Sequence, residues 1–333
     1  MAVVSLNVPP RLGHMSERLS DDFDDLLARQ RGVFARWQVA AIALDPGVVA
    51  ASWRSGRSQR LYRGVYAAFT GPPCREAELW AAVLRAGPDA VLSHQTAAEL
   101  DGFAPGPSRL IHVTVPLEKR VVRVPGIALH RSGRLEMARH PARTPPRTRV
   151  EETALDLAQL AVTFDDAFGW ISRPCAKRLT KPALLLRAMM SRSKVRWRAE
   201  LKLALADIAE GVLSPLENRY VRNVERPHGL PAAKRQVVIT RGPRHEYLDN
   251  LYEEFGIGVE LDGQAYHPAE ERWQDIGRDR ALAAEGVLVL RFGWGDVNDR
   301  ACQAAMELGG AAQKRGWAGS LRPCGPTCPV IRT

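Results

Sequence analysis

The sequence is poor in cysteine and has no long apolar segment. Its five cysteines are odd in number and widely spaced, so they do not form the disulfide framework of a small secreted protein. Cys324 and Cys328 are close together, and we expect free thiols in a loose tail, with a metal-binding knuckle as the alternative. No apolar run of about 18 residues is present, so no membrane span is expected. The N-terminus lacks the basic and then apolar order of a signal peptide, which favours a cytoplasmic protein.

The positive charge of the chain is unevenly distributed. Its 333 residues favour two or three domains, and 47 Lys and Arg outnumber 37 Asp and Glu. Residues 173–202 carry 10 basic side chains against one acidic, whereas residues 211–317 carry 14 basic against 16 acidic. This separation is expected if one part of the protein binds a polyanion and another binds metal. A solvated basic face that binds nothing is the alternative.

Acidic residues concentrate in a predicted β-hairpin near the C-terminal end. Two short apolar strands, 245–251 and 257–262, flank a five-residue turn. Asp249 lies within the first strand, and Glu260 and Asp262 lie two residues apart at the end of the second. Alternate residues of a strand point to one face, so these two carboxylates lie side by side and the third can join them from the paired strand. Such a cluster repels itself unless a cation neutralises it, and a hard divalent cation with oxygen ligands is the natural candidate.

The elements around this hairpin are expected to follow the order α-β-β-β-α-β-α. A crossover helix precedes the last strand, so that strand should pair in parallel and the sheet should be mixed. The chain is therefore expected to be a multidomain α/β protein. The expected elements beside the hairpin are a helix from Ser214 to about Val224, a strand over 235–240, a helix over 269–285, a strand over 287–292 and a helix from Asp296.

The N-terminal part predicts a DNA-binding module. After residues 1–20, which we expect to be disordered, three short helices and a strand-rich segment follow within residues 21–70. This pattern is typical of a winged helix-turn-helix. A small helical cap that binds nothing is the alternative. The basic side chains expected to face phosphates are Arg54, Arg57, Arg60 and Arg63.

The remaining segments are expected to connect these two modules. In the middle segment, His112 and His130 are interpreted as neighbouring histidines of a sheet rather than as metal ligands. In the basic segment, Trp197 lies among arginines, either next to bound phosphate or buried beneath a solvated surface. The predicted divisions are a disordered N-terminus (1–20), a winged helix-turn-helix (21–70), an α/β middle domain (71–170), a basic helical connector (171–210), a C-terminal domain that contains the acidic hairpin (211–317) and a loose tail (318–333).

The run RLYRGVYA, residues 60–67, follows the predicted short helices. It resembles the N-terminal domain of AbiEi-type antitoxins, the transcriptional repressors of some type IV toxin–antitoxin systems. The resemblance covers roughly residues 20–70. It implies DNA binding by the wing and the recognition helix. A toxin partner does not follow from it alone, although a toxin or another protein partner is compatible with it.

Several motifs of the C-terminal part occur in an order that carries a second resemblance. They are SPLENRY (214–220), YLDNLY (247–252), VELDGQAYH (259–267), RDRALAAEGVLVLRFGW (278–294) and the dipeptide Asp296-Val297. Together they resemble the PD-(D/E)XK nuclease fold, and within it the Vsr-like endonucleases and a related Vsr-like domain family common in actinobacteria. The resemblance implies a restriction-endonuclease-like core that cuts or nicks DNA with Mg²⁺ or Mn²⁺.

This resemblance assigns roles to individual residues. Asp249 would be the central metal ligand, and Glu260 and Asp262 occupy the (D/E)XK positions, so these three would hold the metal. Glu217 on the leading helix would reach the same metal directly or through water. His267 matches the Vsr-type histidine and would act as general acid or base.

The basic residues of this domain follow the family pattern only in part. Arg278 and Arg291 would hold phosphate or pair with the acids. The usual Lys of (D/E)XK is Asp262 in this chain, so the ordinary water-orienting cation is missing. Gln264 or His267 would have to substitute for it, or the site follows the Vsr variant, in which this position is not Lys.

Alternative functions follow from these patterns. The first is a metal-dependent DNA endonuclease with a DNA-binding N-terminal domain. The second is an AbiEi-like repressor or antitoxin whose nuclease-fold domain is catalytically inactive. An RNA-directed nuclease is a third, because the metal chemistry does not depend on the sugar.

Overall fold

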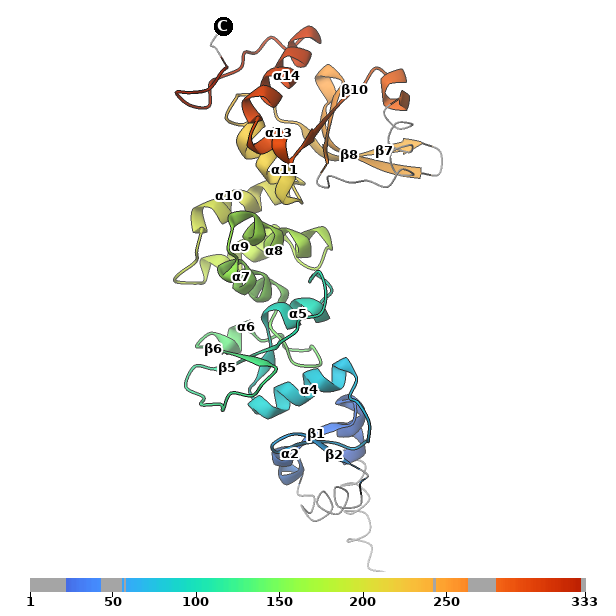
Figure 1. The fold of residues 1–333 in the computed structure, drawn as a ribbon, viewed down its shortest axis with the longest axis vertical. Helices are drawn as coiled ribbons and strands as arrows, with labels where there is room; N and C mark the ends of the chain where they lie inside the picture. Colours follow the sequence, from blue (N-terminus) through green and yellow to red (C-terminus); the bar gives the residue numbers. More distant parts are fainter. Residues whose placement is uncertain (1–21, 43–55, 57, 242–243, 263–279, 331–333) are drawn as a thin grey trace, which may run out of the picture. The chain divides into compact units, whose positions relative to one another are not determined.

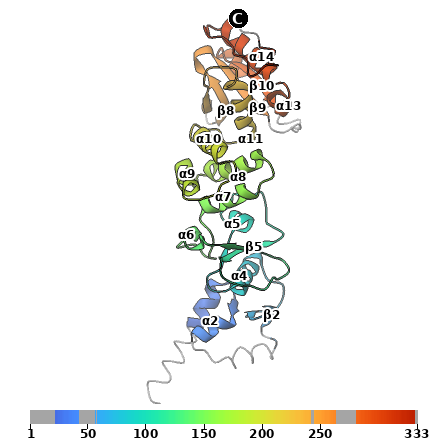
Figure 2. The ribbon, with the colours of Figure 1, turned by 90° about the vertical axis from the view of Figure 1, so that its left-hand side faces the viewer.

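Each of the two units of the chain, residues 1–156 and 157–333, combines helices with small sheets. The computed structural model describes residues 22–42, 56, 58–241, 244–262 and 280–330. Helices and strands alternate along the chain, which confirms the predicted mixed α/β class (Figures 1 and 2). Among these described residues, no helix is long and apolar enough to cross a membrane.

The first unit begins with a small antiparallel sheet. Its strand β3 lies between β1 and β2, and Gly64 occupies the two-residue turn of the β2–β3 hairpin with a φ of 81°, a left-handed conformation that favours glycine. The predicted helix near Val48 falls in residues 43–55, outside the described part. The elements in chain order are a helix over residues 22–29, β1 (Val33–Ala35), α2 (Arg36–Ala41), β2 (Gln59–Tyr62) and β3 (Val65–Ala67).

Helix α4 (Arg75–Ala86) is buried on two sides because it carries two apolar stripes, each with the i, i+3, i+4, i+7 spacing of one helix face. The first stripe packs with β1 and β3 and consists of Ala77, Trp80, Ala81 and Leu84. The second packs with a further sheet and consists of Leu79, Ala82, Val83 and Ala86. That sheet is ordered β4-β5-β6, with β5 parallel to β6, and is formed by β4 (Val91–Leu92), β5 (Ile111–Pro116) and β6 (Ile127–Ser132).

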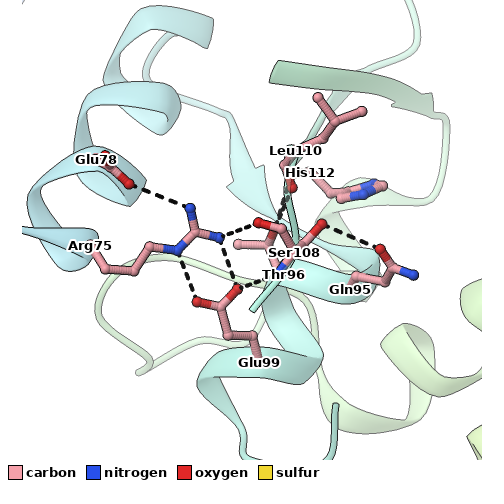
Figure 3. Close-up of polar contacts among 8 residues, drawn as sticks. All are labelled: Arg75, Glu78, Gln95, Thr96, Glu99, Ser108, Leu110 and His112. Atoms are coloured by element: carbon pink, nitrogen blue, oxygen red, sulfur yellow. Dashed lines mark hydrogen bonds and ion pairs between the residues drawn. The ribbon is translucent and has the colours of Figure 1, made fainter. Parts of the chain in front are cut away.

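An arginine at the start of α4 ties it to α5 (His94–Leu100) (Figure 3). The Arg75 guanidinium donates from Nε and Nη2 to the two carboxylate oxygens of Glu99, each at 2.9 Å. It also donates to the Ser108 carbonyl at 3.0 Å, and the Ser108 backbone N–H donates back to Glu99 at 3.1 Å. Burial raises the pKa of Glu99, but the bonds from Arg75 and Ser108 outweigh it and lower the pKa overall. The remaining helices of this region are α6 (Leu135–Ala138) and α7 (Val150–Leu160).

The second unit contains a four-stranded mixed sheet ordered β10-β9-β8-β7. β7, β8 and β9 are antiparallel neighbours, and β10 pairs with β9 in parallel, which confirms the predicted hairpin and the parallel last strand. Helices α11, α13 and α14 gather at one side of this sheet (Figure 1). The elements that build this part are α11 (Pro215–Arg219), the π-helix η1 (Tyr220–Glu225), β7 (Lys234–Arg241), β8 (Arg244–Tyr252), the 3₁₀ turn η2 (Glu253–Phe255), β9 (Ile257–Asp262), a helical segment at residues 280–284, β10 (Leu288–Gly293), α13 (Trp294–Asn298) and α14 (Ala301–Lys314).

The basic segment of the second unit consists of helices whose arginines bind backbone carbonyls. The helices are α8 (Phe164–Ala176), α9 (Pro182–Met190) and α10 (Arg198–Ala209). The Arg196 guanidinium stacks 3.8 Å from the centre of the Trp197 ring and donates to the Ala161 carbonyl at 2.8 Å. Arg198 donates to the carbonyls of Met189 and Arg192. Arg196 therefore ties the basic segment to the residues that follow α7, and Arg198 binds within the segment, which supports the alternative that Trp197 lies beneath a solvated basic surface.

Candidate active site

Three of the predicted acids lie on two neighbouring strands of the mixed sheet. The last paired residues of β8 and β9 are Asn250 and Val259, so Asp249 lies next to the end of this pairing. Beyond that end, the Asp249 side chain links the two strands in place of a backbone hydrogen bond. Its Oδ2 accepts a hydrogen bond from the Leu261 backbone N–H at 2.9 Å. Leu261 stands between Glu260 and Asp262 in the sequence. This bond therefore anchors the Asp249 carboxylate at the segment that carries the other two acids.

Gln236 of β7 holds the other oxygen of the same carboxylate. The pairs Arg235 with Asn250 and Val237 with Leu248 leave Gln236 opposite Asp249. Gln236 has a φ of 49°, a left-handed conformation that non-glycine residues adopt rarely and that carries strain. In this conformation its amide Nε2 donates to Asp249 Oδ1 at 3.3 Å. Strained backbone of this kind clusters at functional sites, and here it serves to place an amide on the central carboxylate.

Glu217 reaches the site from helix α11. Ser214 caps this helix and accepts a hydrogen bond from the Glu217 backbone N–H at 3.1 Å, and Pro215 occupies the first turn. The Glu217 carboxylate accepts from the Leu213 backbone N–H at 2.9 Å. Glu217 thus acts as an acid in the first turn of α11, at the end of the helix where a negative charge is favourable.

The electrostatics of Glu217 show that it also belongs to the acid cluster. Its residue is only 7% exposed, and burial raises its pKa above the ordinary value. The negative charge of Asp249 raises the pKa further, while hydrogen bonds from Leu213, Ser214 and Gln236 lower it. A buried carboxyl group next to a second carboxylate favours either protonation or a bound cation.

Asp262 is paired with an arginine from the next strand. Arg291 of β10 is the register partner of Glu260, and its Nη1 lies 3.3 and 3.4 Å from the two carboxylate oxygens of Asp262. Glu260 is 7% exposed, and Asp262 is half-buried. Arg291 therefore brings a permanent positive charge to the Asp262 carboxylate.

The structure thus brings Glu217, Asp249, Asp262 and Arg291 into one site with Gln236, which the sequence analysis did not select. Glu260 lies on the same strand end. The other predicted residues of this site, His267 and Arg278, lie outside the described residues, as does Gln264. Arg60 and Arg63 are exposed on the β2–β3 hairpin of the first unit, and Arg54 and Arg57 also lie outside the described part.

A buried polar network supports this site from η1 and the strands, and the sequence analysis missed it. Arg235 of β7 donates to Glu225 of η1 and to the side chain of Asn250. The Tyr252 hydroxyl donates to Glu225 Oε2 at 2.8 Å and lies 2.7 Å from the Tyr220 hydroxyl. All five residues lie in the interior or at its edge, so the network fixes the π-helix to β7 and β8 beside Asp249.

The donor set at Asp249 fits a hard divalent cation. Carboxylate oxygens are the ligands that Mg²⁺ and Mn²⁺ prefer, and burial, with a lesser contribution from the charge of Asp249, raises the pKa of Glu217, so a nearby cation would stabilise its charged form. Within the described residues, these carboxylates are not among the groups whose ligand atoms all lie within 4.8 Å of one another. Binding a cation would therefore draw them closer together.

The predicted histidine neighbours of the first unit are confirmed. His112 Nδ1 lies 3.0 Å from His130 Nε2, and the ring of His94 stacks on that of His130 at 3.8 Å with 18° between the planes. Burial, followed by the charge of His130, lowers the pKa of His112 to about 4. Burial also lowers the pKa of His130. The 3.0 Å contact between the ring nitrogens of His112 and His130 is that of a hydrogen bond, and the three rings also offer ligand atoms within 4.8 Å of one another.

No protein-family model matches the chain, and comparison with curated proteins finds no match.

Proposed function

We propose that the second unit is a divalent-metal-dependent DNA endonuclease, which cuts or nicks phosphodiester bonds, and that the first unit binds DNA. The observation that carries the proposal is the position of Asp249. Two hydrogen bonds fix its carboxylate, from Leu261 and Gln236, and its charge adds to the burial that raises the pKa of Glu217 on a different element. A protein that only folds or binds has no evident need for a buried carboxyl group that senses the charge of a second, fixed carboxylate.

The topology of the second unit supports this proposal. The order α11, β7, β8, β9, β10 with a parallel last pairing is the order expected for a PD-(D/E)XK core. In that core the acids lie on a leading helix and on two adjacent central strands. Glu217, Asp249 and Glu260 lie on such elements.

Each residue has a role in the proposed hydrolysis. A bound Mg²⁺ or Mn²⁺ would polarise the phosphoryl oxygen and lower the pKa of the attacking water. Asp249, Glu260 and Asp262 would hold the ion, and Glu217 would reach it directly or accept a proton from a water. Gln236 keeps the Asp249 carboxylate turned to the site through its amide bond.

Arg291 would supply part of the positive charge that a lysine at position 262 would otherwise supply. Its guanidinium stays protonated, so it cannot act as a base, but it can hold a phosphate oxygen or neutralise Asp262. The proton transfers then fall to Glu217, whose pKa is raised, or to His267, which remains a prediction from the sequence.

Cleavage of supercoiled plasmid DNA by the full chain tests the proposal. With Mg²⁺ or Mn²⁺ the wild type should convert it to nicked or linear DNA, and Asp249→Ala should abolish the conversion. Glu254→Gln is the matched control, since Glu254 is an exposed acid in the turn η2 of the same hairpin. Equal behaviour of wild type and Asp249→Ala across both metals and across DNA and RNA substrates would contradict the proposal, and cleavage of RNA alone would transfer it to an RNA-directed nuclease.

A second candidate is an AbiEi-like DNA-binding repressor whose nuclease fold is inactive. The observation that favours it is the order of the first described elements, a helix, β1, α2 and then the β2–β3 hairpin; with the third helix that the sequence predicts in residues 43–55, this would be the order of a winged helix-turn-helix. Arg60 and Arg63 lie exposed on this hairpin. Tight binding of DNA without cleavage in any metal would favour the repressor, and binding with cleavage would favour the endonuclease.

A further inference from the structure

A second grouping of ligand atoms lies in the same unit and shares no residue with the acidic site. It consists of His228 in the turn after η1, Cys302 in the first turn of α14, and Cys324 and Cys328 in the segment after α14. The four ligand atoms all lie within 4.8 Å of one another. We propose that these four residues form a structural zinc site that fastens residues 318–330 to the second unit.

The distances between the ligand atoms fit a tetrahedral zinc ion. Cys302 Sγ lies 3.6 Å from both Cys324 Sγ and Cys328 Sγ. Cys328 Sγ lies 3.7 Å from His228 Nε2. With zinc–sulfur bonds of about 2.3 Å and a zinc–nitrogen bond of about 2.0 Å, tetrahedral geometry places sulfurs about 3.8 Å apart and sulfur about 3.5 Å from nitrogen. A disulfide would need sulfurs at about 2.0 Å, so no pair of these cysteines is bonded.

The ring of His228 is held in an orientation and a tautomer that leave Nε2 able to bind a metal. His228 is fully buried, and its Nδ1 lies 2.9 Å from the Val224 carbonyl oxygen. A carbonyl only accepts hydrogen bonds, so Nδ1 carries the proton and donates it. In the neutral ring Nε2 then keeps its lone pair, and this is the atom that faces Cys328. A carbonyl partner on the far nitrogen is the usual orienting contact of a zinc-bound histidine.

The chemistry of the ligands selects the ion and its role. Three thiolates and one imidazole are soft or borderline donors, which favour zinc over the Mg²⁺ or Mn²⁺ expected at Asp249. Four protein ligands complete the tetrahedron and leave no open position for water, so the ion would be structural rather than catalytic. On binding, the three thiols release their protons, and the complex carries one net negative charge beside the guanidinium of Arg322, which lies against Gly229.

The segment that the ion would fasten has no helix or strand in residues 318–330. It is held by a few contacts with the body of the unit. The Arg322 backbone N–H donates to the His228 carbonyl at 2.9 Å, and Leu321 packs so closely on α14 that a Cβ at Gly309 would lie 2.9 Å from its Cδ1. Val330 is 5% exposed. A metal that joins three segments would stabilise this arrangement far more than these contacts alone.

The zinc content of the purified full chain tests the proposal. The protein is produced without a polyhistidine tag, kept reduced and measured by mass spectrometry of the metal. We expect about one zinc per chain in the wild type and a loss of at least about tenfold in Cys302→Ser and in Cys328→Ser. Cys74→Ser and Cys175→Ser are matched controls outside the cluster and should keep the zinc, as should His112→Ala and Asp249→Asn.

A second measurement uses only the wild type, so it does not depend on the folding of the variants. Replacement of zinc by Co²⁺ should give the visible absorption bands of a tetrahedral cobalt thiolate, and removal of the metal should speed hydrogen exchange at the Arg322 amide. A reduced wild type that neither retains zinc nor gives these bands would overturn the proposal. Equal zinc loss in the Cys74 and Cys302 variants would overturn it as well.

Discussion

The carboxylate of Asp249 accepts a hydrogen bond from the backbone N–H of Leu261 at 2.9 Å. This bond joins β8 to β9 beyond their last paired residues, Asn250 and Val259. A strand residue that turns its carboxylate onto the neighbouring backbone fixes the carboxylate more firmly than a free rotamer would. The position of the central acid is therefore built into the sheet.

Replacing Glu217 by Gln should abolish DNA cleavage and raise the free energy of unfolding at pH 7. The pKa of Glu217 is raised by burial and by Asp249, so the folded protein binds a proton there more readily than the unfolded chain. Glu217 therefore lowers the free energy of unfolding as pH rises from its unfolded value of 4.5 through its folded pKa. Glu217→Gln should be more stable than the wild type at pH 7, with the difference disappearing below pH 4.5, while cleavage is lost.

Thermal unfolding of both proteins across this pH range, without added Mg²⁺ or Mn²⁺, measures the effect. Glu254→Gln serves as the control, because Glu254 is an exposed acid and should give no such pH-dependent gain. A stability difference that stays constant with pH would show that Glu217 acts only as a helix cap.

Tyr252→Phe should lower the free energy of unfolding of the second unit without changing any of the proposed metal-binding acids. The change removes the donor to Glu225 and one partner of the Tyr220 hydroxyl, both buried, and should cost about 1–3 kcal/mol in the free energy of unfolding. Tyr247→Phe on the same strand is the matched control, since Tyr247 is 57% exposed and its change should stay within about 0.5 kcal/mol. Denaturant unfolding of both variants measures the two values. Similar small effects in both would mean that the buried network does not hold η1 to the sheet.

Arg63→Glu should weaken DNA binding in a salt-dependent way. Arg63 is exposed at the turn of the β2–β3 hairpin, where a phosphate contact would lie if the hairpin is a wing. Fluorescence anisotropy with a DNA duplex should show lower affinity and a salt slope smaller by about one. Arg123→Glu makes the same charge change in an exposed loop of the same unit. If Arg123→Glu reduces the affinity and the slope as much, the effect belongs to net charge and not to the wing.

Part of this architecture follows from the sequence because it depends on local patterns. The alternation of apolar residues around Asp249 predicts β8 and β9, and the crossover before Leu288 predicts the parallel pairing of β10, both confirmed by the structure. The neighbouring positions of His112 and His130 also follow from two strand patterns. These features need only the period of a strand and the handedness of its connections.

The rest depends on contacts between distant segments that no local pattern specifies. Gln236 looks like an ordinary strand residue, and only the folded sheet shows its left-handed backbone and its bond to Asp249. The pairing of Glu225 with Arg235 joins a helix to a strand, and both residues read as surface charges in the sequence. His228 lies far from Cys302 along the chain, so the spacing of the cysteines alone does not reveal the fourth ligand.

The most direct test of the account is the position of a bound Mn²⁺ ion in crystals of the full chain, located by its anomalous scattering. The account predicts a peak between the carboxylates of Asp249 and Glu260 in the wild type, and its loss in Asp249→Asn with the sheet otherwise unchanged. Manganese that binds only elsewhere, or a peak that persists at the same place in Asp249→Asn, would contradict the central claim that these acids form a metal-dependent active site.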